Sequence, residues 1–367
     1  MDEGKIGNVE MICLLVNAIA CKAFFTSVAA VVEKVGTAGW YMVLISDIVA
    51  IGVFSQMYAL SKAYPGKNLL EIYDDIVGKK VGKVLSFISC IMLFVTVSIT
   101  LREFTDATNV YLLHESPPGF IVGMFIIAMV TVCFLGIEGL GRVAKFLSFI
   151  LLFNFLIVMV LSYRTFQGYK LFPILGYGLG NTVRHGIMRS SAFGEFILLG
   201  VFAKALNNTK DLGKIGYKSL IIGGLIISIV LFSVIISFPY YVTTELADPL
   251  YIMVSLIQYG RFFQRIEVVF IFTWNLSTLI GLTAIFYGSI ICYCHVFNIK
   301  DKKPIIISFG ISTYISTLIV PSISIILDYI VPIFRGYGWI GFYTPIFISW
   351  AIWLLFRRGK QTNVEKS

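Results

Sequence analysis

The sequence predicts an all-α integral membrane protein with ten transmembrane helices, and three observations support this prediction. Hydrophobic residues make up 58% of the 367-residue chain and charged residues only 13%, about half of the charged share in soluble domains. Apolar runs of about 20 residues, the length that a bilayer requires, recur from one end of the chain to the other. The segments between these runs are too short for a soluble domain, so we expect one transmembrane domain over residues 1–367.

The first five predicted helices are separated by short polar or glycine-rich connections. A polar loop follows the second helix and carries a short helical patch at 69–77, and Pro117 and Pro118 precede the fourth helix. The glycines between Gly136 and Arg142 predict a sharp turn before the fifth helix. The five helices are expected at about 9–32, 40–63, 84–105, 119–137 and 143–163.

The last five predicted helices follow a longer connection at 164–189, which contains Pro173 and five glycines. A basic loop at 207–218 separates the sixth and seventh helices, and the mixed segment 249–263 is typical of a helix at the membrane interface. The helices are expected at about 190–206, 219–241, 266–296, 304–327 and 338–356.

The distribution of charge predicts how the helices are oriented. Most of the 29 Lys and Arg residues fall in segments on the same side as the N-terminus, and basic segments are typically cytoplasmic. We therefore expect both termini in the cytoplasm. Ten helices divide into two sets of five that begin on opposite sides, since five is odd, and this is the arrangement of inverted repeats. The two repeats are expected at about 9–163 and 190–356.

The net charge and the cysteines have ordinary explanations in such a protein. Basic cytoplasmic loops account for the charge of +9, so we expect no nucleic-acid partner. All six cysteines lie in or beside apolar runs without zinc-site spacing, and we expect neither disulfides nor a metal. The three histidines are dispersed, and the sequence has no nucleophile elbow or phosphate-binding loop. These features argue against an enzyme and against a bound cofactor.

Polar residues interrupt the first and sixth helices at equivalent places in the two repeats. The interruptions run from Asn17 to Lys22 and from Ser190 to Glu195. Small hydroxyls, a glycine and a carboxylate can open a helix, free its backbone groups and place one acid at membrane depth. In inverted-repeat transporters the first helix of each repeat is often the broken one. We therefore expect a polar ligand-binding chamber where the two breaks meet.

Glu195 and Lys22 are the charged residues of these breaks. A carboxylate inside the membrane costs a few kcal/mol unless it is paired or hydrated, so Glu195 is expected to pair with a ligand amine, hold a proton or stabilise the break. The alternative is a structural partnership with Lys22, Arg189 or nearby backbone. Lys22 can bind a ligand carboxylate or occupy the place of a coupling sodium ion; alternatively, it forms an ion pair with Asp47 or with Glu195. A switchable pair among Lys22, Asp47 and Glu195 would be a gate.

Five features of the chain resemble one family of membrane proteins. They are the short segment before the first helix, Tyr64-Pro-Gly-Lys-Asn-Leu-Leu-Glu-Ile-Tyr73, Gly139-Leu-Gly-Arg142, Ala192-Phe-Gly-Glu-Phe196, and Arg265-Ile-Glu-Val-Val-Phe270 followed by Trp274. Their order and spacing resemble the B subunit of bacterial spore nutrient-germinant receptors, in the spore germination permease branch of the amino acid–polyamine–organocation (APC) superfamily. The resemblance implies a LeuT-like 5+5 bundle with helices 1 and 6 broken. It also implies a place in the spore inner membrane beside an A subunit and a lipoprotein C subunit.

The helix breaks and the resemblance together define a candidate ligand site. Small polar residues at the breaks can contact a zwitterion, with hydroxyl and aromatic side chains of the third and eighth helices around it. The same residue types also serve close helix packing. Arg102 and Glu103 are expected only to tether the end of the third helix. The candidate ligand-binding residues are Asn17, Ala18, Ala20, Cys21, Lys22, Thr96, Thr100, Ser190, Ser191, Phe193, Gly194, Glu195, Trp274, Asn275 and Thr278.

Three functions are consistent with these features. The expected one is a germinant-sensing, transporter-like receptor subunit that binds a small molecule, in the first instance an amino acid, at the breaks. The alternative is an amino-acid permease, with or without proton coupling, that moves its ligand across the membrane. The third is a scaffold or ion-release component without a ligand.

Overall fold

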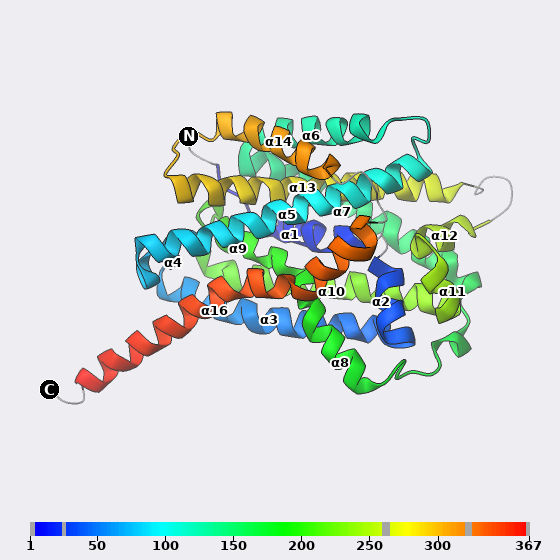
Figure 1. The fold of residues 1–367 in the computed structure, drawn as a ribbon, viewed down its shortest axis with the longest axis horizontal. Coiled ribbons are helices and arrows are strands. Elements are labelled where there is room, and N and C mark those ends of the chain that lie inside the picture. Colours follow the sequence, from blue (N-terminus) through cyan, green and yellow to red (C-terminus); the bar gives the residue numbers. More distant parts are fainter. Residues whose placement is uncertain (1–3, 24–26, 259–264, 320–324, 365–367) are drawn as a thin grey trace.

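The computed structural model describes residues 4–23, 27–258, 265–319 and 325–364, and these residues form an all-α bundle (Figure 1). Within these ranges the only β-structure is one isolated bridge between Ile6 and Leu206. The all-α prediction is therefore confirmed. In the same ranges, six helices are individually long and apolar enough to cross a membrane. The total of ten spans stays a prediction.

The longer helices are joined or interrupted by short helical turns, labelled η. The first half of the chain contains α1 (Asn8–Ala20), η1 (Cys21–Ala23), α2 (Ser27–Val35), η2 (Gly36–Ala38), α3 (Gly39–Ala63), α4 (Leu69–Val77), α5 (Lys79–Tyr111), α6 (Pro118–Phe134) and α7 (Gly136–Leu161). The second half contains η3 (Ser162–Thr165), η4 (Gly168–Leu171), α8 (Leu179–Met188), η5 (Arg189–Phe196), α9 (Ile197–Val201), η6 (Ala203–Ala205), η7 (Thr209–Asp211), α10 (Leu212–Ser237), α11 (Tyr240–Glu245), α12 (Pro249–Ser255), α13 (Ile266–Phe297), α14 (Lys303–Leu318), η8 (Ile326–Ile330) and α16 (Val331–Val364).

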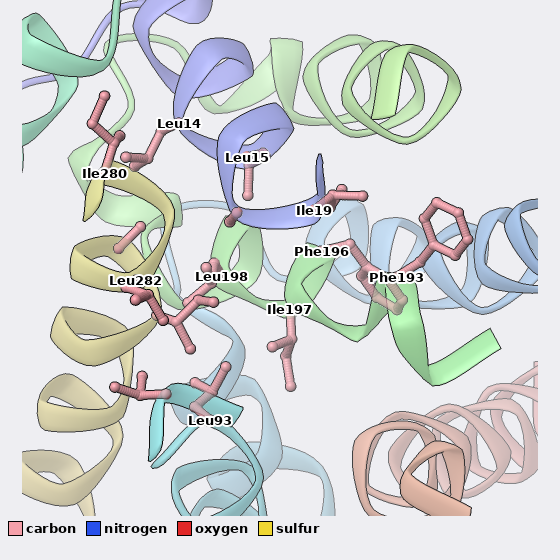
Figure 2. Packing of buried hydrophobic residues seen from close by; sticks show 14 of the residues in the cluster. Leu14, Leu15, Ile19, Leu93, Phe193, Phe196, Ile197, Leu198, Ile280 and Leu282 are labelled. Carbon is pink, nitrogen blue, oxygen red and sulfur yellow. The ribbon is translucent and has the colours of Figure 1, made fainter. Parts of the chain in front are cut away.

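Helix α1 lies in the middle of the bundle, where it packs against α7, α10 and α13 (Figure 1). Helices α13 and α5 form one side of the bundle and α10 and α3 the other. Leu15 of α1 and Leu198 of α9 are completely buried at this junction (Figure 2). Lipid tails are as apolar as leucine, so close van der Waals packing rather than escape from water holds such contacts together.

The first and sixth spans are both interrupted, as the sequence predicts. Helix α1 ends at Ala20 and gives way to the 3₁₀ turn η1, and α2 begins at Ser27. Helix α8 ends at Met188, and eight residues of 3₁₀ helix separate it from α9. The second interruption coincides with the Ser190–Glu195 stretch.

Several expected boundaries are wrong. The connection predicted at 164–189 contains α8, which is part of the sixth span and went unrecognised because its ten residues mix apolar side chains with Asn181, Arg184 and His185. The sharp turn predicted from Gly136 to Arg142 is the first part of α7, where only Gly136 has a positive φ, of 74°.

Two further expectations concern the end of the chain and its interfacial helix. Helix α16 begins at Val331 rather than at about residue 338, so seven more residues belong to the last span. The segment predicted as an interfacial helix at 249–263 contains α12, which ends at Ser255, while 259–264 lie outside the described residues. Residues 320–324, near the end of the predicted ninth helix, also lie outside them.

Candidate functional site

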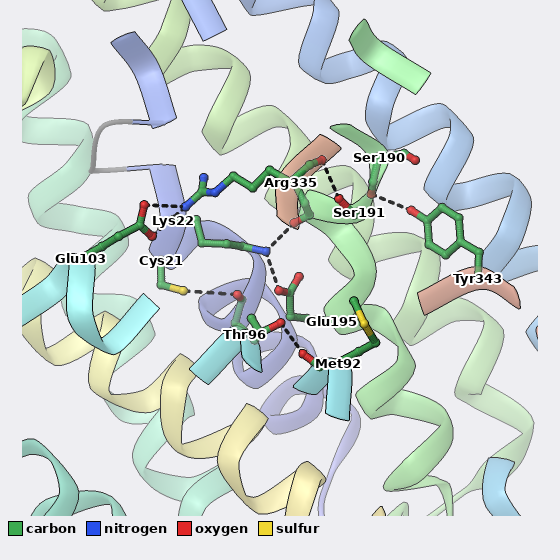
Figure 3. A network of polar contacts seen from close by, with 12 residues as sticks. Cys21, Lys22, Met92, Thr96, Glu103, Ser190, Ser191, Glu195, Arg335 and Tyr343 are labelled. Carbon is green, nitrogen blue, oxygen red and sulfur yellow. Dashed lines mark hydrogen bonds and ion pairs between the residues drawn. The ribbon is translucent and has the colours of Figure 1, made fainter. Parts of the chain in front are cut away.

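The break in the sixth span is stabilised by side chains from η1 and α16 (Figure 3). The Lys22 ammonium donates to the carbonyl oxygen of Ala192 at 2.6 Å, and the Tyr343 hydroxyl donates to that of Ser190, also at 2.6 Å. The Ser191 hydroxyl donates to the carbonyl oxygen of Arg335 at 3.0 Å. Backbone groups released from a helix need partners inside a membrane, and the bonds to Ala192 and Ser190 supply them, while the Ser191 bond ties the break to α16.

The break in the first span is supported from α13. The indole N–H of Trp274 donates to the carbonyl oxygen of Cys21 at 3.2 Å, and carbonyl groups at the end of a helix need such partners. Cys21 itself is buried and its thiol contacts the carbonyl oxygen of Ala18 at 3.3 Å. Trp274 and Cys21 therefore stabilise the break through these contacts, and little of their polar surface is exposed.

A buried ion pair joins the two breaks. Lys22 Nζ lies 2.6 Å from Glu195 Oε1, with side-chain exposures of 9% and 1% (Figure 3). The other carboxylate oxygen, Glu195 Oε2, is buried and has no hydrogen-bond partner among the described residues. Desolvation of two charges is expensive and is compensated only when every polar atom is satisfied. An unsatisfied carboxylate oxygen at this point is an acceptor available to an incoming donor.

Asp47 does not take part in this pair. Its side chain is buried on α3 and faces Gly224 of α10, where a Cβ atom would lie 2.4 Å from Asp47 Oδ2. Asp47 Oδ1 has no hydrogen-bond partner among the described residues. Of the two partners that the sequence left open for Lys22, the structure places Glu195 beside it.

A second buried ion pair lies next to the first and was missed by the sequence analysis. Arg335 Nη2 of α16 donates to both carboxylate oxygens of Glu103, at 3.0 and 2.8 Å, and ties α16 to α5 (Figure 3). Arg335 was overlooked because the last span was expected to begin after it. The expectation that Glu103 only tethers the end of the third helix is wrong, since α5 continues to Tyr111 and Glu103 lies within it.

The space around these charges is narrow. Lys22, Thr96, Thr100, Ser191 and Glu195 line a hollow of about 20 Å³. A second hollow of about 30 Å³ is lined by Lys22 and Phe193, among others. Each holds about one water molecule, so the charged centre is closed to anything larger in this conformation.

A wider cavity of about 180 Å³ lies on another side of α1, between α7, α10 and α13, and has a mainly apolar lining. Asn17, Ala20 and Trp274 line it. The Asn17 amide donates to Ser148 Oγ at 2.6 Å and its oxygen accepts from the Ser277 hydroxyl at 2.5 Å. Asn17 is therefore engaged in joining α1 to α7 and α13.

The remaining candidates lie apart from the charged centre or serve close packing. Asn275 accepts from the Thr108 hydroxyl at 2.9 Å, and Ala18 is buried where α1 crosses Gly281. Thr278 is buried. Gly194 faces the ring of Phe342 so closely that a Cβ atom would lie 2.7 Å from it. The structure thus brings together Lys22, Thr96, Thr100, Ser191 and Glu195, and separates them from the set around Asn17.

Solved structures of secondary transporters have the same fold. A Na⁺-coupled sialic acid symporter in its substrate-bound outward-open state superimposes with a TM-score of 0.69 at 10% identity, covering 94% of this chain and 78% of that one. MhsT in complex with L-phenylalanine superimposes with a TM-score of 0.66 at 14% identity, covering 95% and 88%. The expected LeuT-type fold is confirmed by these similarities.

Relatives identify the family. Spore germination protein KB of Bacillus subtilis (strain 168) is 22% identical over 288 residues, 77% of each chain. Spore germination protein YndE of the same organism is 22% identical over 320 residues, 84% of each chain. A family model described as spore germination protein matches residues 5–328. This family and the transporter folds it resembles are membrane proteins of the transporter or receptor kind rather than enzymes, as the sequence predicts. On this match across most of its length, the chain is a multi-pass membrane protein that belongs to the spore germination permease family.

Proposed function

We propose that this chain is the nutrient-sensing, transporter-like subunit of a spore germination receptor, and that it binds a small zwitterion, in the first instance an amino acid. In this proposal the protein resides in the spore inner membrane with both termini in the cytoplasm and works with A and C subunits. The relatives named as spore germination proteins support the setting. The proposal rests above all on one observation, the buried pair of Lys22 and Glu195 at the meeting point of two broken helices.

The pair has the chemistry needed to recognise a zwitterion. Glu195 Oε2, which has no partner among the described residues, accepts a ligand ammonium. Lys22 then turns from Glu195 to the ligand carboxylate, so that one ion pair is replaced by two. The hydroxyls of Thr96, Thr100 and Ser191, which line the hollow beside the pair, supply further donors and acceptors. This exchange keeps every buried charge paired.

The closed centre explains how binding produces a signal. A hollow of about 20 Å³ excludes an amino acid, so the ligand binds a state in which the centre is wider. A ligand shifts a conformational equilibrium only by its difference in affinity for the two states. The ion pair of Glu103 and Arg335 stabilises the closed state by joining α5 to α16, and the ligand must outweigh it. The resulting shift in population is the signal passed to partner subunits.

Germination of spores carrying variants of the native receptor tests this proposal. Dose–response curves to a panel of amino acids, nucleosides and sugars are compared for wild type, Glu195→Gln and Lys22→Ala. We expect both variants to raise the nutrient concentration for half-maximal germination by at least tenfold, which corresponds to about 1.4 kcal/mol of ligand binding. Glu138→Gln, which alters an exposed carboxylate in α7, is the control and leaves the curve unchanged. Unchanged responses of both pocket variants to every nutrient would favour a scaffold without a ligand.

An amino-acid permease is the second candidate, because coupled transporters use this fold. Proteoliposomes that contain the purified chain and a labelled amino acid separate the two functions. A sensor binds the amino acid at equilibrium without accumulating it. Uptake against a concentration gradient by the isolated chain, with or without an imposed proton gradient, would mean that the protein is a permease and not a sensor.

A further inference from the structure

A large pocket lies far from the charged centre, at the end of the bundle where α13 ends and α14 begins. Its volume is about 670 Å³, and it is lined by Lys300, Lys302 and Lys303 together with Tyr287 and Leu135. Gly4, before α1, also lines this pocket, so the described start of the chain lies beside the α13–α14 loop. Nothing in the proposed function uses this pocket.

The lysines of this pocket outnumber the acids available to them. Asp301 and Glu138 also line it, but Asp301 Oδ1 accepts from the backbone N–H of Lys303 at 3.1 Å and Glu138 pairs with Arg142. In the part of the chain that the structure describes, the ammonium groups of Lys300 and Lys303 have no ion-pair partner within 4 Å and both residues are exposed. Two cations therefore face a cavity in which Glu138 is paired with Arg142 and Asp301 is the one other acid among the described lining residues.

Lys302 lies deeper than its neighbours. Its ammonium is 5.9 Å from the centroid of the Tyr287 ring, and burial lowers the pKa of the lysine. A cation withdrawn from water in this way is stabilised by a nearby anion.

The surface next to the lysines is apolar. Leu135, at the end of α6, is 65% exposed, and Ile307 and Ile311 of α14 are 52% and 59% exposed. Helices α6 and α14 pack against each other, and Leu135 itself lines the pocket, so exposed apolar side chains of both helices lie near the lysines. A ligand that fits both parts has an anionic head and a long apolar tail.

We propose that this pocket binds the headgroup of an anionic phospholipid, with the phosphate diester between Lys300 and Lys303 and one acyl chain along α6 and α14. Basic pockets between transmembrane helices on the cytoplasmic side are suited to such headgroups. The cavity accommodates the phosphate together with the glycerol backbone. The lipid would contact both the α6–α7 turn and the α13–α14 loop, which line the pocket together.

Native mass spectrometry of the purified full chain tests this site. The protein is equilibrated with equal amounts of dioleoyl phosphatidylglycerol and dioleoyl phosphatidylcholine, and the ratio of the two bound lipids is measured. Each lysine near an anionic lipid contributes about fivefold to binding, so Lys300→Gln with Lys303→Gln should lower the ratio roughly 25-fold. Lys300→Arg with Lys303→Arg keeps the charge and should keep the ratio. Lys210→Gln with Lys218→Gln removes two exposed lysines elsewhere in the chain and should leave the ratio unchanged.

Several outcomes would overturn the proposal. They are an unchanged ratio in the Lys300 and Lys303 glutamine variant, or an equal fall in the Lys210 and Lys218 control. A third is binding of glycerol 3-phosphate as tight as that of the lipid, which would assign the pocket to a soluble phosphate. A fourth is displacement of the lipid by an acidic peptide at equal concentration, which would assign it to a protein partner. Equal thermal unfolding midpoints of all variants in phosphatidylcholine confirm that any loss reflects binding and not misfolding.

Discussion

At the scale of single residues, the Lys22–Glu195 pair is the feature whose energetics can be measured most directly. Both charges are almost fully buried, so removing one leaves the other without a partner at membrane depth. Such losses typically cost about 3–5 kcal/mol, whereas removal of both charges costs far less. We therefore expect Lys22→Met and Glu195→Gln each to lower the thermal unfolding midpoint in detergent strongly, and the double variant to recover much of the loss.

An exposed ion pair serves as the control for this comparison of the single variants with the double variant. Glu138 and Arg142 form an ion pair in which the arginine side chain is 75% exposed and the glutamate 41%. Surface pairs contribute about 0–1 kcal/mol, so Glu138→Gln and Arg142→Met should change the midpoint little, alone or together. Additive losses from Lys22→Met and Glu195→Gln would mean that the two side chains do not interact in solution.

The buried carboxyl of Asp248 should make the stability of the fold depend on pH. It lies between α11 and α12, and burial raises the pKa of its carboxyl from an ordinary 3.8 to about 6, against a lowering effect of the Tyr111 hydroxyl. Because the folded state binds this proton more tightly than the unfolded chain does, the fold gains stability as the pH falls from above 6 towards 4. Well above pH 6 the ionised carboxylate costs about 3 kcal/mol.

Asp248→Asn should therefore raise the unfolding midpoint at pH 7.5, and the gap between variant and wild type should close towards pH 4. Scanning the midpoints of both proteins across this range measures the effect. Glu115→Gln, which changes an exposed carboxylate, is the control and should give no pH-dependent gap. A gap of equal size at both ends of the range would exclude a titrating carboxyl as its cause.

At the scale of elements, the η5 break depends on how closely it approaches α16. A Cβ atom at Gly194 would lie 2.7 Å from the Phe342 ring, which is itself buried. Overpacking of this kind typically costs about 1–3 kcal/mol, so Gly194→Ala should destabilise the protein by that amount. Phe342→Leu in the same chain should restore part of the stability, because it makes room for the new methyl group.

A glycine with free space around it provides the comparison. Gly52 of α3 has no atom within 4 Å of the place that its Cβ atom would take. Gly52→Ala should leave the midpoint unchanged or raise it slightly, since alanine favours a helix. Equal destabilisation by both alanine variants would indicate that backbone conformation, rather than contact with Phe342, requires glycine at position 194.

The sequence predicts those elements whose apolar runs match the thickness of a bilayer. The expected second helix begins one residue after the start of α3, and the expected eighth helix ends one residue before the end of α13. Their other boundaries agree, because long apolar runs have clear ends. Helix α8 escaped prediction since half of a broken span is too short and too polar for that signal. The interruptions themselves were predictable, because Lys22 and Glu195 are unusual inside apolar runs.

The pairing of charges could not be predicted from one sequence. Lys22 had two plausible partners, and only the relative positions of η1, η5 and α3 distinguish Glu195 from Asp47. Arg335 lay outside the expected span, so nothing in the sequence connected it with Glu103, which is 232 positions away. A search for every charged residue within seven positions of a predicted span end would have included both.

At the scale of the whole molecule, the two ion pairs and the two broken spans form a single closed centre. The pairs connect η1 with η5 and α5 with α16, so four segments that are distant in sequence are joined by two electrostatic contacts. In the proposed function, a ligand that replaces one pair would weaken the link between its segments while it satisfies their charges. The opening of the site would then depend on the ligand.

The orientation of the bundle is predicted from the distribution of charge, and this prediction can be tested directly. The α3–α4 loop contains Lys67 and is followed by the lysine-rich start of α5, whereas Tyr169, in η4 between α7 and α8, is 71% exposed on a far less basic connection. Positively charged segments stay in the cytoplasm. A membrane-impermeant maleimide applied to intact cells should therefore label Tyr169→Cys, and should label Lys67→Cys only after lysis.

The native chain is the control for this labelling, and five of its six cysteines are buried while Cys13 is half-buried. Labelling of Lys67→Cys alone in intact cells would place both termini outside and move the lysine pocket at the start of α14 to the outer face. Labelling of Tyr169→Cys alone supports inverted repeats, because the first span then enters from the cytoplasm and the sixth from outside.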